Sequence, residues 1–141
     1  MKLTLGWMGI LLLTASCATD TPNVDDLKGA WKGHSVKVKS SDPNLQSVYR
    51  NQYKLHETSI LSFSENKTYR FQELTTHTTS DGHWKLEGDK LMISNFGDTL
   101  VYKIVSLSED SLITSNMLKF NDGSNGEKSE IEVIQTYARA N

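Results

Sequence analysis

The chain has 141 residues, which is the size of one ordinary domain. Lysine and arginine total 15 and aspartate and glutamate total 17, so the formal net charge of -2 gives no basic patch for nucleic acid. The single cysteine excludes an internal disulfide and a four-cysteine zinc site.

An apolar run near the start predicts an export signal. Leu3–Leu13 follows a lysine and is shorter than the about 20 apolar residues that span a bilayer. The five residues that end at Cys17 (LTASC) resemble the lipobox of a bacterial lipoprotein signal, with threonine where that signal prefers leucine. The resemblance implies that residues 1–16 are removed and that Cys17 carries lipid. The alternative is an ordinary secretory signal that happens to end near a cysteine.

The residues after this signal predict a tether on a membrane. Ala18 follows the cysteine, and by resemblance to the sorting rules of Gram-negative bacteria it favours a lipid anchor in the outer membrane. The sequence leaves open whether the protein faces the periplasm or the outside. Residues 17–26 contain too few apolar side chains to pack, so we expect a lipidated cysteine and a flexible tether there. Residues 27–141 are the expected folded domain.

Apolar and polar residues mostly alternate beyond residue 27, and this period of two indicates β-strands. We expect eight strands, at residues 31–39, 59–64, 68–78, 82–87, 90–95, 100–107, 111–118 and 130–138. The sixth is apolar on both faces, which favours a central position. Short antiparallel strands with tight connections predict an all-β, up-and-down barrel, because closure removes exposed sheet edges.

One segment after the first strand has helical spacing instead. Asp42 and Pro43 are typical of a helix N-cap and first helical position, and apolar side chains follow at intervals of three and four. We therefore predict one short helix over residues 43–52. The alternative is that residues 51–59 begin a longer second strand.

The first strand poses a problem of parity. Trp31 and Val36 are five residues apart, so a regular strand would place them on opposite faces. Both can point into a barrel only if a bulge inserts one residue, and Gly33 is the natural site for it. His34 is in phase with Val36, so we expect it to face inward, either as a polar group of a pocket or as a satisfied interior histidine.

Four segments in sequence order carry a family resemblance. They are residues 27–31 (LKGAW), 61–69 (LSFSENKTY), 82–91 (GHWKLEGDKL) and 102–112 (YKIVSLSEDSL). Together they resemble the lipocalin-like domain of small bacterial lipoproteins. This resemblance implies a small β-barrel or half-barrel. It also implies that Arg139 packs on Trp31 as the late arginine does in lipocalins.

The mouths of β-barrels are frequent ligand sites, so the resemblance implies a cavity. The residues expected to line it are Tyr49, Tyr53, Phe63, Tyr69, Phe71, Trp84, Tyr102 and His34. For Trp84, as for Trp31, a core position is the favoured alternative. We predict a membrane-anchored lipoprotein that binds a small apolar or amphipathic ligand. The alternative is a filled barrel that docks a protein of the cell envelope.

The sequence offers little catalytic chemistry. It lacks a nucleophile elbow, a phosphate loop and a zinc-protease motif, so we expect neither enzymatic activity nor a cofactor. His77 and His83 flank an expected turn at residues 79–81 but are too few for a usual zinc site, and we expect no metal. Aspartates before Thr99 and Ser111 resemble a bacterial O-glycosylation motif; the alternative is a turn aspartate before a strand.

Overall fold

The computed structural model describes residues 21–49, 52–121 and 128–141, so the expected signal and Cys17 lie outside the described part of the chain. The elements there are α1 (Val24–Leu27), β1 (Gly29–Lys39), α2 (Pro43–Val48), α3 (Gln52–Glu57), β2 (Ser59–Phe63), β3 (Thr68–Glu73), β4 (Thr78–Glu87), β5 (Lys90–Asn95), β6 (Asp98–Leu107), β7 (Ser111–Asn121) and β8 (Lys128–Arg139). None of the helices in these ranges is long and apolar enough to cross a membrane.

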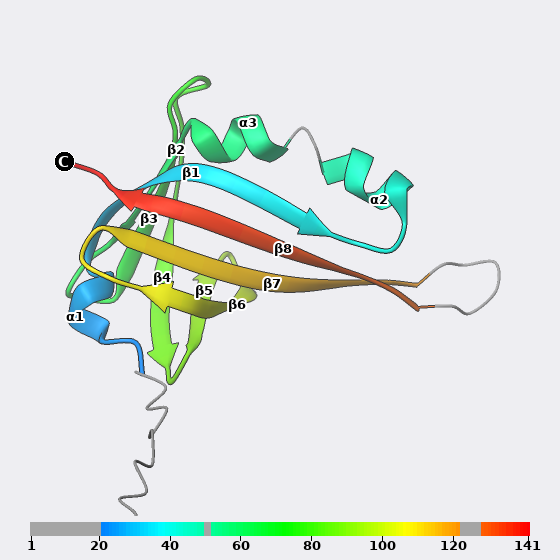
Figure 1. The fold of residues 1–141 in the computed structure, drawn as a ribbon. Helices are drawn as coiled ribbons and strands as arrows, with labels where there is room; N and C mark the ends of the chain where they lie inside the picture. Colours follow the sequence, from blue (N-terminus) through cyan, green and yellow to red (C-terminus); the bar gives the residue numbers. More distant parts are fainter. Residues whose placement is uncertain (1–20, 50–51, 122–127) are drawn as a thin grey trace, which may run out of the picture.

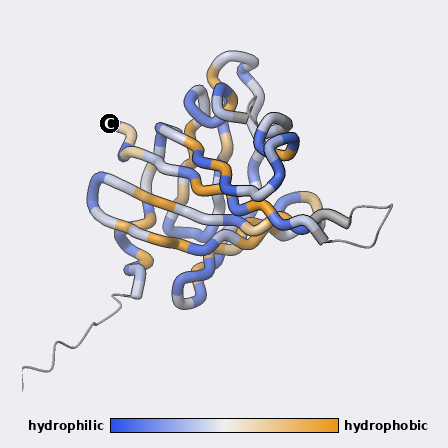
Figure 2. Tube along the Cα trace, turned by 45° about the vertical axis from the view of Figure 1, so that its right-hand side comes forward, coloured by the Kyte–Doolittle hydropathy of each residue, from blue (hydrophilic) through white to orange (hydrophobic). Residues whose placement is uncertain are grey.

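The eight strands follow one another around a closed antiparallel barrel, and β8 pairs with β1 (Figure 1). This confirms the predicted up-and-down barrel. Polar and apolar residues alternate along the strands, as Figure 2 shows, because one face points inward and the other meets water. The prediction of a central sixth strand is wrong, since a closed barrel has no centre. Leu100, Val101 and Val105 of β6 are about half exposed.

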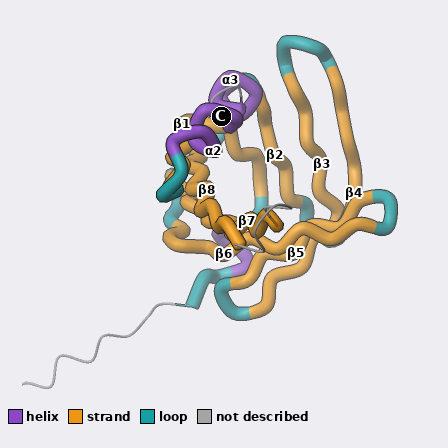
Figure 3. Tube along the Cα trace, turned by 90° about the vertical axis from the view of Figure 1, so that its right-hand side faces the viewer, coloured by secondary structure: helices purple, strands orange, loops and turns teal. Residues whose placement is uncertain are grey.

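The two ends of the barrel differ. At the closed end lie α1 and the short connections 64–67, 88–89 and 108–110. At the open end lie α2, α3 and the connections 74–77 and 96–97. Figure 3 shows α2 and α3 on the side of β1 and β2 at this end. The helix α1 begins at Val24, ahead of the expected domain boundary, and buries Leu27 completely.

A bulge in β1 shifts the alternation of its side chains, so that Trp31 and Val36 can point to the same face of the strand. Gly33 pairs with Tyr137 of β8 and Ser35 pairs with the preceding residue Thr136, so His34 is the inserted residue. This confirms the predicted bulge at Gly33. The prediction that His34 faces inward is wrong: its side chain is exposed, because the alternation of faces breaks at the inserted residue itself.

The segment between β1 and β2 contains two helices instead of one. α2 begins at Pro43 as predicted, with the Asp42 carboxylate accepting a hydrogen bond from the Asn44 amide at 2.8 Å. This confirms the predicted short helix after the first strand, although α2 ends at Val48 and a second helix, α3, follows it. The alternative of a strand over 51–59 is wrong, because α3 covers Gln52–Glu57. Such a short helix depends on tertiary contacts, and α3 packs its buried His56 against Gly33 of β1.

The turn between β3 and β4 lies at residues 74–77, so the predicted turn at 79–81 is wrong. The buried Glu73 carboxylate accepts hydrogen bonds from the Thr75 and Thr76 amides at 3.0 and 2.5 Å and from the Thr58 hydroxyl at 2.6 Å. These bonds, first those from the Thr58 and Thr76 hydroxyls, lower the pKa of Glu73 to about 2. An ionised carboxylate therefore fixes the turn.

His77 and His83, which were expected to flank a turn at residues 79–81, do not flank a turn. His77 lies in the β3–β4 turn with a φ of 57°, and His83 lies within β4, paired with Thr68. Among the described residues, no three metal-binding side chains come together.

Candidate functional site

A cavity of about 220 Å³ lies inside the barrel below α3. Its wall consists of inward-pointing side chains at alternate positions of six strands, β2, β3 and β5–β8, together with two residues of α3. These residues are Leu55, His56, Ser59, Leu61, Phe63, Tyr69, Phe71, Leu91, Ile93, Leu100, Tyr102, Leu112, Thr114, Gln135 and Tyr137. Leu55 and Leu100 line the cavity and are about half exposed, so the cavity reaches solvent.

Trp31 seals the closed end. Its side chain is completely buried, and its indole Nε1 donates a hydrogen bond to the Leu27 carbonyl at 2.7 Å. The Arg139 guanidinium lies 3.9 Å from the centre of the indole ring, at a distance typical of a cation–π contact. This confirms the packing of Arg139 on Trp31 that the family resemblance implies.

The same guanidinium links three segments of the chain at the closed end of the barrel. It donates hydrogen bonds to the carbonyls of Lys28 at 2.5 Å, Asp26 at 2.7 Å and Glu109 at 2.9 Å. It therefore joins the end of β8 to α1 and to the β6–β7 connection. Because its donors point at backbone carbonyls, Arg139 belongs to the closed end of the barrel and does not line the cavity.

Trp84 also belongs to the core of the closed end. Its ring meets Phe63 edge to face at 5.7 Å, and its Nε1 donates to the Ser64 carbonyl at 3.1 Å. The Lys67 ammonium lies 4.1 Å from the ring centre. These contacts use both the ring and its N–H, and Trp84 is not part of the cavity wall.

The structure brings together half of the residues proposed from sequence. Phe63, Tyr69, Phe71 and Tyr102 line the cavity. Tyr49 is the C-cap of α2 and Tyr53 is half-buried on α3, and neither lines the cavity. His34 borders a separate shallow depression on the outer surface.

His56 connects α3 to the wall of the barrel. Its Nε2 lies 2.8 Å from the Thr136 carbonyl, and its Nδ1 lies 3.4 Å from the Gln135 amide nitrogen. Because a carbonyl can only accept and an amide NH₂ can only donate, Nε2 carries the proton and Nδ1 accepts. Burial lowers the pKa of His56, which favours this neutral form. The ring also meets Tyr137 edge to face at 4.6 Å.

The remaining polar groups of the wall are hydroxyls. Burial, followed by the neighbouring Tyr102, raises the pKa of Tyr137, and burial, followed by Tyr69, raises that of Tyr102. Both phenols are therefore neutral at physiological pH. The Thr114 hydroxyl is buried and makes no hydrogen bond of normal distance and angle among the described residues. It does interact with the Tyr137 phenol, which lowers the pKa of Tyr137 by less than burial raises it.

Several residues of the cavity wall are not aromatic and were not expected from sequence, although the alternation along their strands indicates them. Leu91, Ile93, Leu112 and Thr114 occupy alternate positions of their strands, and the same period of two that predicts the strands assigns them to the inner face. No pattern in the sequence predicts that His56 lines the cavity, because its position depends on α3, which the sequence pattern does not indicate.

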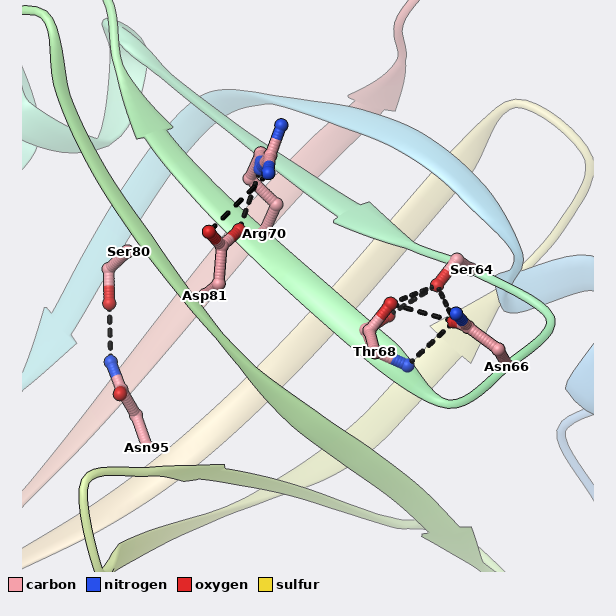
Figure 4. A network of polar contacts seen from close by, with 7 residues as sticks. All are labelled: Ser64, Asn66, Thr68, Arg70, Ser80, Asp81 and Asn95. Carbon is pink, nitrogen blue, oxygen red and sulfur yellow. Dashed lines mark hydrogen bonds and ion pairs between the residues drawn. The ribbon is translucent and has the colours of Figure 1, made fainter.

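A second depression lies on the outer face of β2, β3 and β4 and is polar. Figure 4 shows its main contacts: Arg70 pairs with Asp81 across β3 and β4 at 2.6 Å. The Asn66 side chain accepts from the hydroxyls of Ser64 and Thr68, at 2.5 and 2.7 Å. These groups pair with one another, as is typical of a solvated sheet face.

Comparison with known proteins gives a family. A model of the lipocalin-like domain matches residues 27–114. Among solved structures, bovine odorant binding protein, complexed with its natural ligand, has 20% sequence identity and a TM-score of 0.42. The match covers 85% of this chain and 75% of that chain. No curated protein matches the sequence.

Proposed function

The chain belongs to the lipocalin-like domain family, and from that membership we propose that its barrel binds a small apolar or amphipathic molecule. The cavity below α3 is the observation that carries this proposal. Its volume of about 220 Å³ exceeds the about 150 Å³ in which an apolar cavity holds benzene. A barrel filled by its own side chains, as the alternative of a docking protein requires, would leave no such space.

We further propose that the protein is exported and held on the outer membrane by lipid on Cys17. The support is the sequence that precedes the cysteine. The described chain enters the barrel at the closed end through α1. A lipid on Cys17 would therefore hold the closed end near the bilayer and leave the cavity opening directed away from it.

Mass spectrometry of the protein purified from its own envelope tests the anchor. The expected mature chain begins at Cys17 and carries the mass of acyl chains, two or more of which give stable anchoring. A mature chain with an unmodified thiol, or one that begins at another residue, contradicts the anchor. Either result would leave the proposal of a ligand-binding cavity standing, because that proposal does not depend on the anchor.

Binding of benzyl alcohol, measured by isothermal titration calorimetry on the full chain, tests the cavity. Phe71 lines the cavity, so Phe71→Trp adds volume where the ligand would lie. We expect this variant to bind at least about tenfold more weakly than the wild type, because overpacked sites reject additional atoms. Phe96→Trp is the matched control, since Phe96 is 97% exposed, and we expect its affinity to equal that of the wild type.

Circular dichroism establishes that both variants keep the barrel. Equal binding by a folded Phe71→Trp variant and the wild type would place the ligand outside the cavity and contradict the proposal. If the wild type binds neither benzyl alcohol nor toluene, ligand binding is excluded for this class of molecule. The docking protein is then the favoured function.

A further inference from the structure

The Thr114 hydroxyl is the most unusual polar group of the cavity wall. Thr114 is 2% exposed, lies in β7 and lines the cavity. Its Oγ1 makes no well-formed hydrogen bond within the described part of the chain, and the Tyr137 phenol is a polar group that interacts with it. Buried polar atoms in proteins are nearly always paired, and an unpaired one destabilises the fold. A ligand with a polar group at this wall would provide the missing partner.

The rest of the wall carries no ionised side chain. Its members are apolar residues, hydroxyls, one amide and one imidazole. Both nitrogens of the His56 imidazole form hydrogen bonds, one with Gln135 and one with Thr136, and the ring is neutral. Two charged groups of the barrel are occupied elsewhere, because Arg139 donates to three backbone carbonyls at the closed end and the Glu73 carboxylate accepts hydrogen bonds from the β3–β4 turn. A carboxylate in the cavity would therefore lie in an apolar site without a counter-charge, which is strongly unfavourable.

Thr114 lies beside other polar groups of the cavity wall. Thr114 pairs in register with Gln135 on β8, and Gln135 binds His56 of α3. In the barrel order β3 is four strands away from β7, and there the apolar Phe71 lines the cavity. A bound molecule that reaches Thr114 would thus meet Gln135 beside it and the apolar ring of Phe71, next to Tyr69, on the opposite wall.

From these observations we propose that the cavity selects uncharged amphipathic molecules with a single hydroxyl, alcohols or phenols rather than carboxylates, and that the Thr114 hydroxyl binds that group. The inference rests on the proposed function, because it takes the cavity as the binding site. It adds the charge and the functional group of the ligand.

Three probes with the same ring separate these properties: toluene is apolar, benzyl alcohol adds a hydroxyl, and benzoate adds a charge. Affinities are measured by calorimetry on the full chain for the wild type, Thr114→Val and Thr114→Ser. For the wild type we expect benzyl alcohol to bind at least about tenfold more tightly than benzoate. Thr114→Val should lose about three- to tenfold in affinity for benzyl alcohol and none for toluene, as expected for one hydrogen bond. Thr114→Ser keeps a hydroxyl and should keep the preference.

Thermal unfolding gives a second readout. Thr114→Val removes an unpaired hydroxyl and preserves the shape of the side chain, so we expect a melting temperature at least equal to that of the wild type. A hydroxyl that only supports the fold would give a lower melting temperature instead.

The inference is overturned if benzoate binds as tightly as benzyl alcohol, or if Thr114→Val leaves the preference for benzyl alcohol over toluene unchanged. If toluene binds as tightly as benzyl alcohol to the wild type, the proposed function stands and this inference fails. If none of the three probes binds, the proposed function fails as well.

Discussion

Replacing Gly33 by alanine is expected to displace α3 from the barrel and to lower the free energy of unfolding by about 3 kcal/mol or more. A Cβ at Gly33 would lie 1.8 Å from the His56 carbonyl oxygen and 2.6 Å from the carbonyl carbon. Both are backbone atoms, so no side-chain rotation relieves the clash. Moving α3 would also break the contact between His56 and Thr136 and widen the opening of the cavity.

Urea unfolding of the wild type and the variant measures this loss. Gly88→Ala is the matched control, because a Cβ at Gly88 meets nothing within 4 Å and only its positive φ of 59° opposes alanine. We expect the control to lose about 1 kcal/mol. If Gly33→Ala loses no more than Gly88→Ala, α3 does not lie against β1 as described.

Replacing Trp31 by alanine is expected to lower the free energy of unfolding by about 3–5 kcal/mol. The indole is completely buried, so its removal leaves a large space at the closed end. The Leu27 carbonyl loses its hydrogen-bond donor, and the Arg139 guanidinium loses the ring that it covers. These effects add to the loss of apolar contact.

Chemical denaturation of Trp31→Ala and Trp31→Phe separates the contributions. Phenylalanine keeps an aromatic ring beneath Arg139 but has no N–H for Leu27, so we expect an intermediate loss. A loss below about 1 kcal/mol for Trp31→Ala would show that Trp31 does not form the core of the closed end.

The parts of the fold that the sequence predicted depend on local alternation. The period of two along the strands gives the barrel, and the parity of Trp31 and Val36 gives the bulge at Gly33. The contact between Trp31 and Arg139 followed from family resemblance, since the two residues are far apart in sequence and meet only because β8 pairs with β1.

The parts that sequence reasoning missed depend on contacts between distant segments. α3 packs on β1 through Gly33, and the pattern of its own six residues does not indicate a helix. The β3–β4 turn is fixed by the Glu73 carboxylate and not by the usual turn residues. His34 has the parity of an inward residue and points outward because it is itself the inserted residue.

The composition of the cavity wall was predictable only in part for the same reason. The aromatic residues Phe63, Tyr69, Phe71 and Tyr102 could be assigned from strand parity. Whether Trp84 lines the cavity or the core depends on its position along the barrel axis, which parity does not define. The hydrogen-bonding state of Thr114 depends on all of its neighbours at once.

A crystal structure of the full chain grown with benzyl alcohol tests ligand binding inside the barrel most directly. We expect electron density for the ring between Phe71 and β7, with the alcohol oxygen within hydrogen-bonding distance of the Thr114 hydroxyl. A cavity closed by its own side chains, with the probe absent or bound only on the outer surface, would contradict it.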